Sequence, residues 1–176
     1  MPAPRIVRPG ADEHIAYYGK YITLVPGDDA WPALEFQLDE TLRLLRPLDE
    51  KAALHRYQPG KWSVKETVGH VFDVERVFAY RSLRFARADE TPLPGFDENK
   101  WVPAATFDQR PLMELVDELR TTRAATLAML RGFDEDAFGR GGAANDAHIT
   151  VRAMAWIIAG HERHHRQLLR ERYGLS

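Results

Sequence analysis

The stretch TVRAMAWIIAGHERHHRQLLRERYG, residues 150–174, combines a helical pattern with more chemically versatile side chains than any other part of the chain. Its apolar residues recur every three or four positions, as on one face of an amphipathic helix. Thr150 is suited to cap the start of that helix, and Gly174 to end it. Within it, His161 and His165 lie four residues apart, so both imidazoles share one helical face and can reach one metal ion.

Three more segments have helical periodicity and predict, with the first, an all-α four-helix bundle. They run from about Asp29 to Leu48, from Ser63 to about Ala88, and onward from Pro111. Ser63 and Glu66 form the pattern of a capping box, which fixes the start of the second segment. We expect residues 1–27 to be an N-terminal arm and residues 28–176 to be the bundle domain. Within the first part, IAYYGKYITLV (residues 15–25) is expected to be a short strand or an extended arm.

A long loop is expected between the second and third helices of this bundle, over residues 91–110, TPLPGFDENKWVPAATFDQR. A connection of that length in a compact domain is usually functional or disordered. Its aromatic residues favour packing against the bundle, and Phe96, Asp97 and Trp101 are expected to wall or cover a site there.

The composition indicates a globular protein and excludes several classes of function. The chain has 176 residues, of which 44% are hydrophobic, and a formal net charge of -2 with both signs scattered. This charge argues against a nucleic-acid or membrane-surface protein that depends on a basic patch. There is no apolar signal-peptide core and no membrane-spanning run, so we expect a cytoplasmic protein. There is also no cysteine, so any metal must be held by histidine and carboxylate.

A third histidine, His70, lies on the inward margin of the second helix, so three imidazoles on two helices are expected to face the core. A single histidine on an apolar face is more often a hydrogen-bonded core residue than a metal ligand. Three buried together are costly unless something satisfies their ring nitrogens, which favours a metal site over an ordinary histidine cluster. Both interpretations remain open on the pattern alone.

The run HERHH also matches H-E-x-x-H, the zinc-protease signature, but its context excludes a protease. No histidine follows His165. Glu171 has the spacing of the third metal ligand of a metzincin, yet Leu168 stands where that motif requires a glycine.

The motifs together resemble the DinB/YfiT-like superfamily. The resemblance rests on Trp-Ser-Val-Lys-Glu at residues 62–66, on His70 four residues later, and on His-Glu-Arg-His-His-Arg-Gln at residues 161–167. It implies a four-helix bundle of that type with an open divalent-metal site whose ligands are His70, His161 and His165. It also implies a metal-dependent hydrolase, or a transferase or isomerase that uses a low-molecular-weight thiol such as bacillithiol or mycothiol. DNA binding is not implied.

The expected partner is therefore a small-molecule substrate, with no nucleic acid and no membrane. Three protein ligands leave positions open for water or substrate, as in a catalytic site. Imidazole ligands suit zinc or nickel, and by softness also copper or iron. The alternative is a non-catalytic bundle that the metal stabilises and that binds a small ligand.

Five further residues are candidates for the surroundings of the metal. Asp73 could orient the His70 imidazole, and Glu162 could point toward a neighbouring helix, although solvated surface carboxylates are the favoured interpretation of both. Arg81, three turns after His70, could bind a substrate carboxylate or extend to the rim of the pocket. His164 and Trp101 are expected at the edge of the pocket. No general base is identified.

Two last expectations concern structure. Glu75 and Arg123 interrupt apolar stripes on different helices, and we expect them to pair in or near the core because an unpaired buried charge is expensive. Trp156 is expected on the outward side of the last helix, where it could form a homodimer contact.

Overall fold

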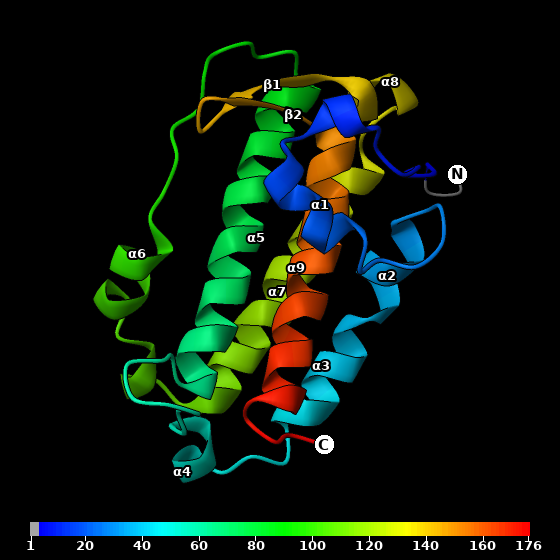
Figure 1. Cartoon of the computed structure of the whole chain (residues 1–176). Coiled ribbons are helices and arrows are strands. Elements are labelled where there is room, and N and C mark those ends of the chain that lie inside the picture. The colour runs from blue at the N-terminus through cyan, green and yellow to red at the C-terminus, as the bar shows by residue number, and fades with distance from the viewer. Residues whose placement is uncertain (1–3) are drawn as a thin grey trace.

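The four long helical segments expected from the sequence form a four-helix bundle in the computed structural model of the chain, which describes residues 4–176. Figure 1 shows α5, α7 and α9 side by side, with the consecutive helices α2 and α3 completing the bundle. The expected all-α class is confirmed, with one small hairpin added. The long elements and the pair α2 and α3 span Trp31–Phe36 (α2), Leu38–Leu45 (α3), Val64–Ala86 (α5), Leu112–Arg131 (α7) and Val151–Glu171 (α9).

Short elements decorate the ends and flanks of the bundle. α6 lies on the outer flank of α5, away from the other bundle helices (Figure 1). The hairpin of β1 and β2 closes one end of the bundle together with α8. These elements are the 3-10 helices η1 (Ala11–Glu13) and η2 (Phe107–Gln109), the helices α1 (Ala16–Ile22), α4 (Glu50–Ala53), α6 (Glu98–Ala104) and α8 (Glu135–Gly139), and the antiparallel strands β1 (Gly141–Ala144) and β2 (Ala147–Thr150).

The first bundle helix is interrupted at Gln37, where a single helix from Asp29 to Leu48 was expected. The carbonyl oxygen of Gln37 accepts a hydrogen bond of 2.8 Å from Arg166 and a tighter, 3-10-type bond from the Glu40 amide. The hydrogen bond from Arg166 of α9 therefore coincides with the break that divides this segment into α2 and α3.

The N-terminal segment contains a helix rather than the expected strand or extended arm. α1 packs closely against α9 at Gly160, where an added Cβ would lie 2.0 Å from the Tyr21 carbonyl oxygen. The absence of a side chain at Gly160 thus lets the two backbones meet. Eleven residues with aromatic and aliphatic side chains on several faces gave too weak a period to separate helix from strand.

The same N-terminal segment buries Trp156, which is fully covered rather than exposed on the outer side of α9. Its indole N–H donates to the carbonyl oxygens of Ile6 and Val7 at 3.0 Å each, and the Arg8 guanidinium lies 4.2 Å from its ring. The expectation of an exposed dimer contact at Trp156 is therefore wrong.

The hairpin was not expected, because Gly141-Gly142-Ala143-Ala144 has low strand propensity. Its two-residue turn, Asn145-Asp146, has positive φ angles of 53° and 60°, as a type I′ turn requires. The long loop joins it, since Leu93 and the hairpin exchange backbone hydrogen bonds. No helix within residues 4–176 is long and apolar enough to cross a membrane.

Candidate metal centre

The histidines that the sequence predicts to converge lie on α5 and α9, two long helices that pack against each other. The capping box at the start of α5 is present: the Ser63 hydroxyl accepts from the Glu66 amide, and the Glu66 carboxylate accepts from the Ser63 amide. α9 begins at Thr150, whose hydroxyl accepts from the Ala153 amide. Both caps fix where each helix begins.

His70, His161 and His165 bring their Nε2 atoms together. The Nε2 atom of His161 lies 3.1 Å from that of His70 and 3.1 Å from that of His165. The three side chains are buried, and their donor atoms all lie within 4.8 Å of one another. The triad, as we call these three residues, is formed as the pattern of residues predicted.

Hydrogen bonding within the triad cannot satisfy all three nitrogens. Each neutral imidazole Nε2 carries either one proton or one lone pair, so the His161 nitrogen can pair with only one of its two neighbours. A metal ion would satisfy all three lone pairs at once. Two nitrogens about 2.1 Å from a zinc ion at a tetrahedral angle lie about 3.4 Å apart, so the observed separations are close to those of a ligand set.

Burial keeps the triad neutral and its lone pairs available. Loss of hydration lowers the pKa of His70 to about 4, and it holds the pKa values of His161 and His165 well below the usual range for histidine. Neutral imidazole is the form that binds a metal. At pH 7 the three residues therefore offer nitrogen ligands without first losing protons.

A cavity of about 420 Å³ opens onto the triad from one side. Its wall includes His70 and His161 together with aromatic side chains from α1 and α5. The rest of its wall comes from the loop before α6, from α6 and from the hairpin turn. This wall contains Tyr18, Tyr21, Phe78, Arg81, Phe96, Glu98 and Asn145. A second hollow of about 270 Å³ reaches His165 and is lined by Trp62, Asn99 and Tyr173.

Arg81 and His164 lie close to where the sequence placed them. Arg81 is 3% exposed and lines the cavity, so it does not extend to the surface. Half-buried His164 packs edge-on against Tyr21 and His165, with ring centroids 5.5 and 5.1 Å apart, outside the group of three donors.

Asp73 and Trp101 lie beside the cavity rather than in it. The Asp73 carboxylate is partly exposed and faces Arg76 at 3.5 Å, with no hydrogen bond to His70 among the described residues, so the alternative in which it orients that imidazole is not seen. Trp101 is 43% exposed and stacks at 4.9 Å on Phe96, which does line the cavity. Asp73 and Trp101 both line a neighbouring apolar hollow. Exposed Asp97 caps α6 by accepting from the Asn99 amide.

Glu162 is neither a surface carboxylate nor part of the cavity. It is 1% exposed and accepts hydrogen bonds from Gln37 at 2.8 Å and from Thr41 at 2.6 Å. Arg123 lies 3.0 Å from it, and Arg166 lies 3.9 Å away. The favoured expectation of a solvated carboxylate is therefore wrong, because α3 and α7 cover the face of α9 from which Glu162 projects.

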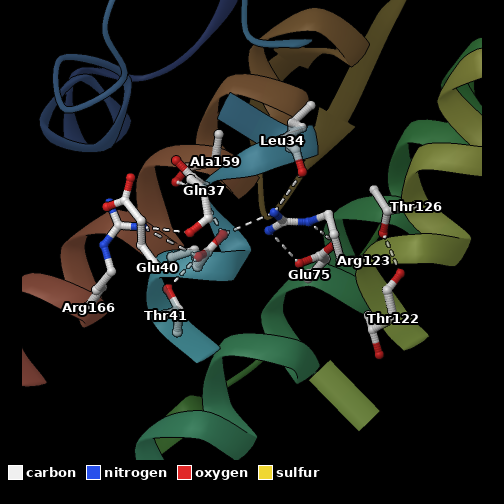
Figure 2. Close-up of polar contacts among 11 residues, drawn as sticks. Leu34, Gln37, Glu40, Thr41, Glu75, Thr122, Arg123, Thr126, Ala159 and Arg166 are labelled. Atoms are coloured by element: carbon white, nitrogen blue, oxygen red, sulfur yellow. Dashed lines mark hydrogen bonds and ion pairs between the residues drawn. The ribbon is translucent and has the colours of Figure 1, made fainter. Parts of the chain in front are cut away.

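The expected pair of Glu75 and Arg123 is confirmed as part of the same network. Arg123 donates to both oxygens of Glu75 at 2.9 Å and to the Leu34 carbonyl oxygen at 3.1 Å. Figure 2 shows the Arg123 guanidinium between Glu75 and Leu34, with Gln37, Thr41 and Arg166 on the other side of the network. Two glutamates and two arginines, Glu75, Glu162, Arg123 and Arg166, thus balance one another inside the bundle; we call them the charge network.

Several residues of the cavity were missed from the sequence. Tyr18 and Tyr21 come from the segment expected to be an arm, and Asn145 comes from the hairpin turn. The spacing of Tyr17, Tyr18 and Tyr21 fits one side of a helix, but these three positions alone are too few to establish a helical period over the segment. Nothing local in the sequence brings Asn145 to the cavity, since its place depends on the pairing of the hairpin with Leu93.

Comparison with known proteins identifies the family. Residues 33–169, which include all three histidines, match the DinB superfamily. The chain belongs to the DinB superfamily. A search of curated proteins finds no match.

Two solved structures share the DinB fold of this chain. The first is YfiT from Bacillus subtilis, described as a probable metal-dependent hydrolase with an unusual four-helix bundle topology; it is 21% identical, with a TM-score of 0.73, over 96% of this chain and 94% of YfiT. The second is the mycothiol-dependent maleylpyruvate isomerase, 16% identical with a TM-score of 0.60, over 84% of this chain and 59% of that protein. At these identities the likeness establishes the fold.

Proposed function

We propose that this DinB protein is a metal-dependent enzyme that acts on a small molecule, with His70, His161 and His165 as the ligands of one divalent ion. The observation that carries the proposal is the convergence of three buried, neutral Nε2 atoms whose hydrogen bonding cannot be satisfied within the triad. Within residues 4–176 the group of potential ligands has three members, which would leave positions for water or substrate.

Zinc or nickel is the ion that suits three imidazoles best. When bound, such an ion would lower the pKa of a coordinated water or thiol, which is the chemistry of a hydrolase or of a thiol-dependent transferase. The surrounding residues support a catalytic rather than a purely structural role. The cavity gives a substrate access to His70 and His161, while the Tyr21 ring covers His161 at 5.3 Å and limits water around it.

Metal content is the first test. Protein purified without a histidine tag should contain one divalent ion per chain by elemental analysis, and His161→Ala should contain none. His55→Ala is the matched control because His55 is exposed and lies outside the triad. Equal metal content in His161→Ala and in the unaltered protein would overturn the proposed ligand set.

Activity and stability then separate an enzyme from a metal-stabilised bundle. The metal-bound protein is assayed for hydrolysis of simple esters and amides and, with added thiol, for transfer to simple electrophiles. An enzyme should lose activity on chelation while the bundle stays folded. If chelation unfolds the protein and neither activity exceeds that of His161→Ala, the ion is structural and the enzymatic proposal is wrong.

A further inference from the structure

Arg81 differs from the other buried cations of this protein. The buried lysine and arginine side chains of residues 4–176 are Lys65, Arg81, Arg123 and Arg166. Lys65 pairs with Glu50 at 2.5 Å, Arg123 with Glu75 at 2.9 Å, and Arg166 with Glu40 at 3.2 Å. Within those residues Arg81 has no carboxylate within 4.0 Å, although an unpaired buried charge is costly.

The protein satisfies only part of the guanidinium of Arg81. One nitrogen donates to the Pro94 carbonyl oxygen at 2.6 Å, and the group lies 5.5 Å from the Phe78 ring and 5.8 Å from the Phe96 ring. The Tyr18 hydroxyl, which lines the same cavity, is a second polar neighbour of the guanidinium. A guanidinium has five N–H donors, so most of its donors have no partner in these contacts. The same side chain lines the cavity that reaches the triad.

The spacing along α5 places Arg81 and the triad at separate ends of this cavity. Arg81 follows His70 by eleven residues, about three turns, so the two lie on nearly the same helical face with a rise of about 16 Å between them. Phe78 and Val74 line the cavity between these positions. A ligand that extends along α5 could therefore contact both ends.

We propose that the cavity takes a small molecule with a carboxylate that pairs with Arg81, so that its other end approaches the triad. The geometry of an arginine fork matches a carboxylate, with two parallel N–H···O bonds. Among the cavity-lining residues of 4–176, Arg81 is the only lysine or arginine and Glu98 the only acid, which favours a singly charged carboxylate over a doubly charged phosphate. The approach to the triad rests on the proposed function, whereas carboxylate binding by Arg81 does not.

The test compares two ligands that differ in charge and little in shape, 3-phenylpropanoate and 3-phenylpropanamide. Their ring suits a cavity lined by tyrosine and phenylalanine side chains. Dissociation constants are measured by calorimetry for the metal-bound protein and after chelation. We expect the carboxylate to bind at least about tenfold more tightly than the amide in both forms, the scale of a charge-assisted bond.

Three variants separate recognition from structural support. Arg81→Gln should abolish the preference for the carboxylate, while Arg81→Lys, which keeps the charge, should retain part of it. If Arg81 only held Pro94 in place, the two variants should show the same ratio of carboxylate to amide affinity. Arg140→Gln is the matched control, since Arg140 also bonds a backbone carbonyl, that of Ala86 at 2.6 Å, but does not line the cavity.

The outcomes distinguish this inference from the metal proposal. No carboxylate preference in the unaltered protein would overturn the inference, as would a preference that survives Arg81→Gln but vanishes on chelation, because the carboxylate would then bind the metal. A preference that depends on Arg81 in a protein that binds no metal would support the carboxylate site and remove the proposed function.

Discussion

The charge network and the triad are both buried groups of ionisable side chains that include residues of α9, yet the charges of the first are paired and the nitrogen atoms of the second are not all satisfied. In the charge network each charged group meets an opposite charge, and Glu162 also accepts from Gln37 and Thr41. In the triad the Nε2 atoms face one another, and the Nδ1 atom of His165 has no hydrogen-bond partner among the described residues. Charges that are paired in this way hold a fold together, whereas several buried nitrogen atoms that face one another without enough partners indicate where a ligand binds.

Arg123 in the charge network and Arg81 in the cavity wall repeat the contrast. Burial alone would lower the pKa of Arg123, but Glu75 and Glu162 raise it above the ordinary value for arginine. At Arg81 burial prevails and the pKa is lowered. The same residue type is thus supplied with counter-charges where it supports the bundle and left without them where it faces the cavity.

Removing Arg123 should produce the largest loss of stability. Arg123→Met leaves Glu75 and Glu162 buried without their shared partner and should lower the free energy of unfolding by about 3–5 kcal/mol. Urea denaturation measures the loss. Arg120→Met is the control: Arg120 pairs with Asp117 on the exposed face of α7, and its loss should cost no more than about 0.5 kcal/mol. Equal effects would contradict the structural role of the charge network.

The pH dependence of the metal-free protein should reveal the triad. Histidine has a pKa of about 6.5 in the unfolded chain, while burial lowers that of His70 to about 4 in the folded protein. Between these values the unfolded state binds more protons, so stability is lost as the pH falls.

Between pH 7.5 and 5.0, His70 alone should account for a loss of about 2 kcal/mol in the free energy of unfolding. The measurement compares the metal-free unaltered protein with metal-free His70→Gln in urea at both pH values, so that carboxylates titrating in both proteins cancel. Identical pH dependence would show that His70 is not kept neutral by burial.

The contact of α1 with α9 should be sensitive to one methyl group. Gly160→Ala places a Cβ against the Tyr21 carbonyl oxygen and should destabilise the protein by on the order of 1–2 kcal/mol. Gly19→Ala, in α1 itself, adds its methyl to open space and should be neutral or slightly stabilising. Thermal melting of both variants checks this, and a harmless Gly160→Ala would mean that α1 can shift without cost.

The smallest expected effect on stability is a gain rather than a loss. His165→Leu removes a buried imidazole whose Nδ1 atom lacks a partner, so the metal-free protein should gain about 1 kcal/mol of stability. Glu162→Leu, three residues earlier on α9, should instead destabilise, because it removes a carboxylate that Arg123 and Arg166 share and the acceptor of the Thr41 hydroxyl. If both variants destabilise equally in urea, the distinction between the two groups fails.

The sequence predicted features that depend on one helix or on the pairing of two helical faces. The four long helical segments, the capping box at Ser63 and the pairing of Glu75 with Arg123 follow from periodicity and from the cost of a buried charge. The convergence of the three histidines follows from the same reasoning. In each case the direction of a side chain from its own helix was enough.

The features that were missed depend on what covers a face, which a helical wheel does not reveal. Trp156 does point away from the bundle centre predicted from four helices, but the N-terminal segment covers it. Glu162 points toward a neighbouring helix, and only the positions of Arg123 and Thr41 show that it is buried. The cavity wall was incomplete for the same reason, since α1 and the hairpin turn come from segments without a clear period.

The consecutive placement of His161 and Glu162 explains why this helix imitates a protease motif. Two pairs at i, i+4 are interleaved with an offset of one residue: His161 with His165 belongs to the triad, and Glu162 with Arg166 belongs to the charge network. His161, Glu162 and His165 together match H-E-x-x-H, although the glutamate faces away from the two imidazoles. Arg166 lies 3.9 Å from Glu162, while Thr41 and Arg123 lie closer, at 2.6 and 3.0 Å. The glutamate of this run therefore supports the bundle, and its two imidazoles belong to the triad.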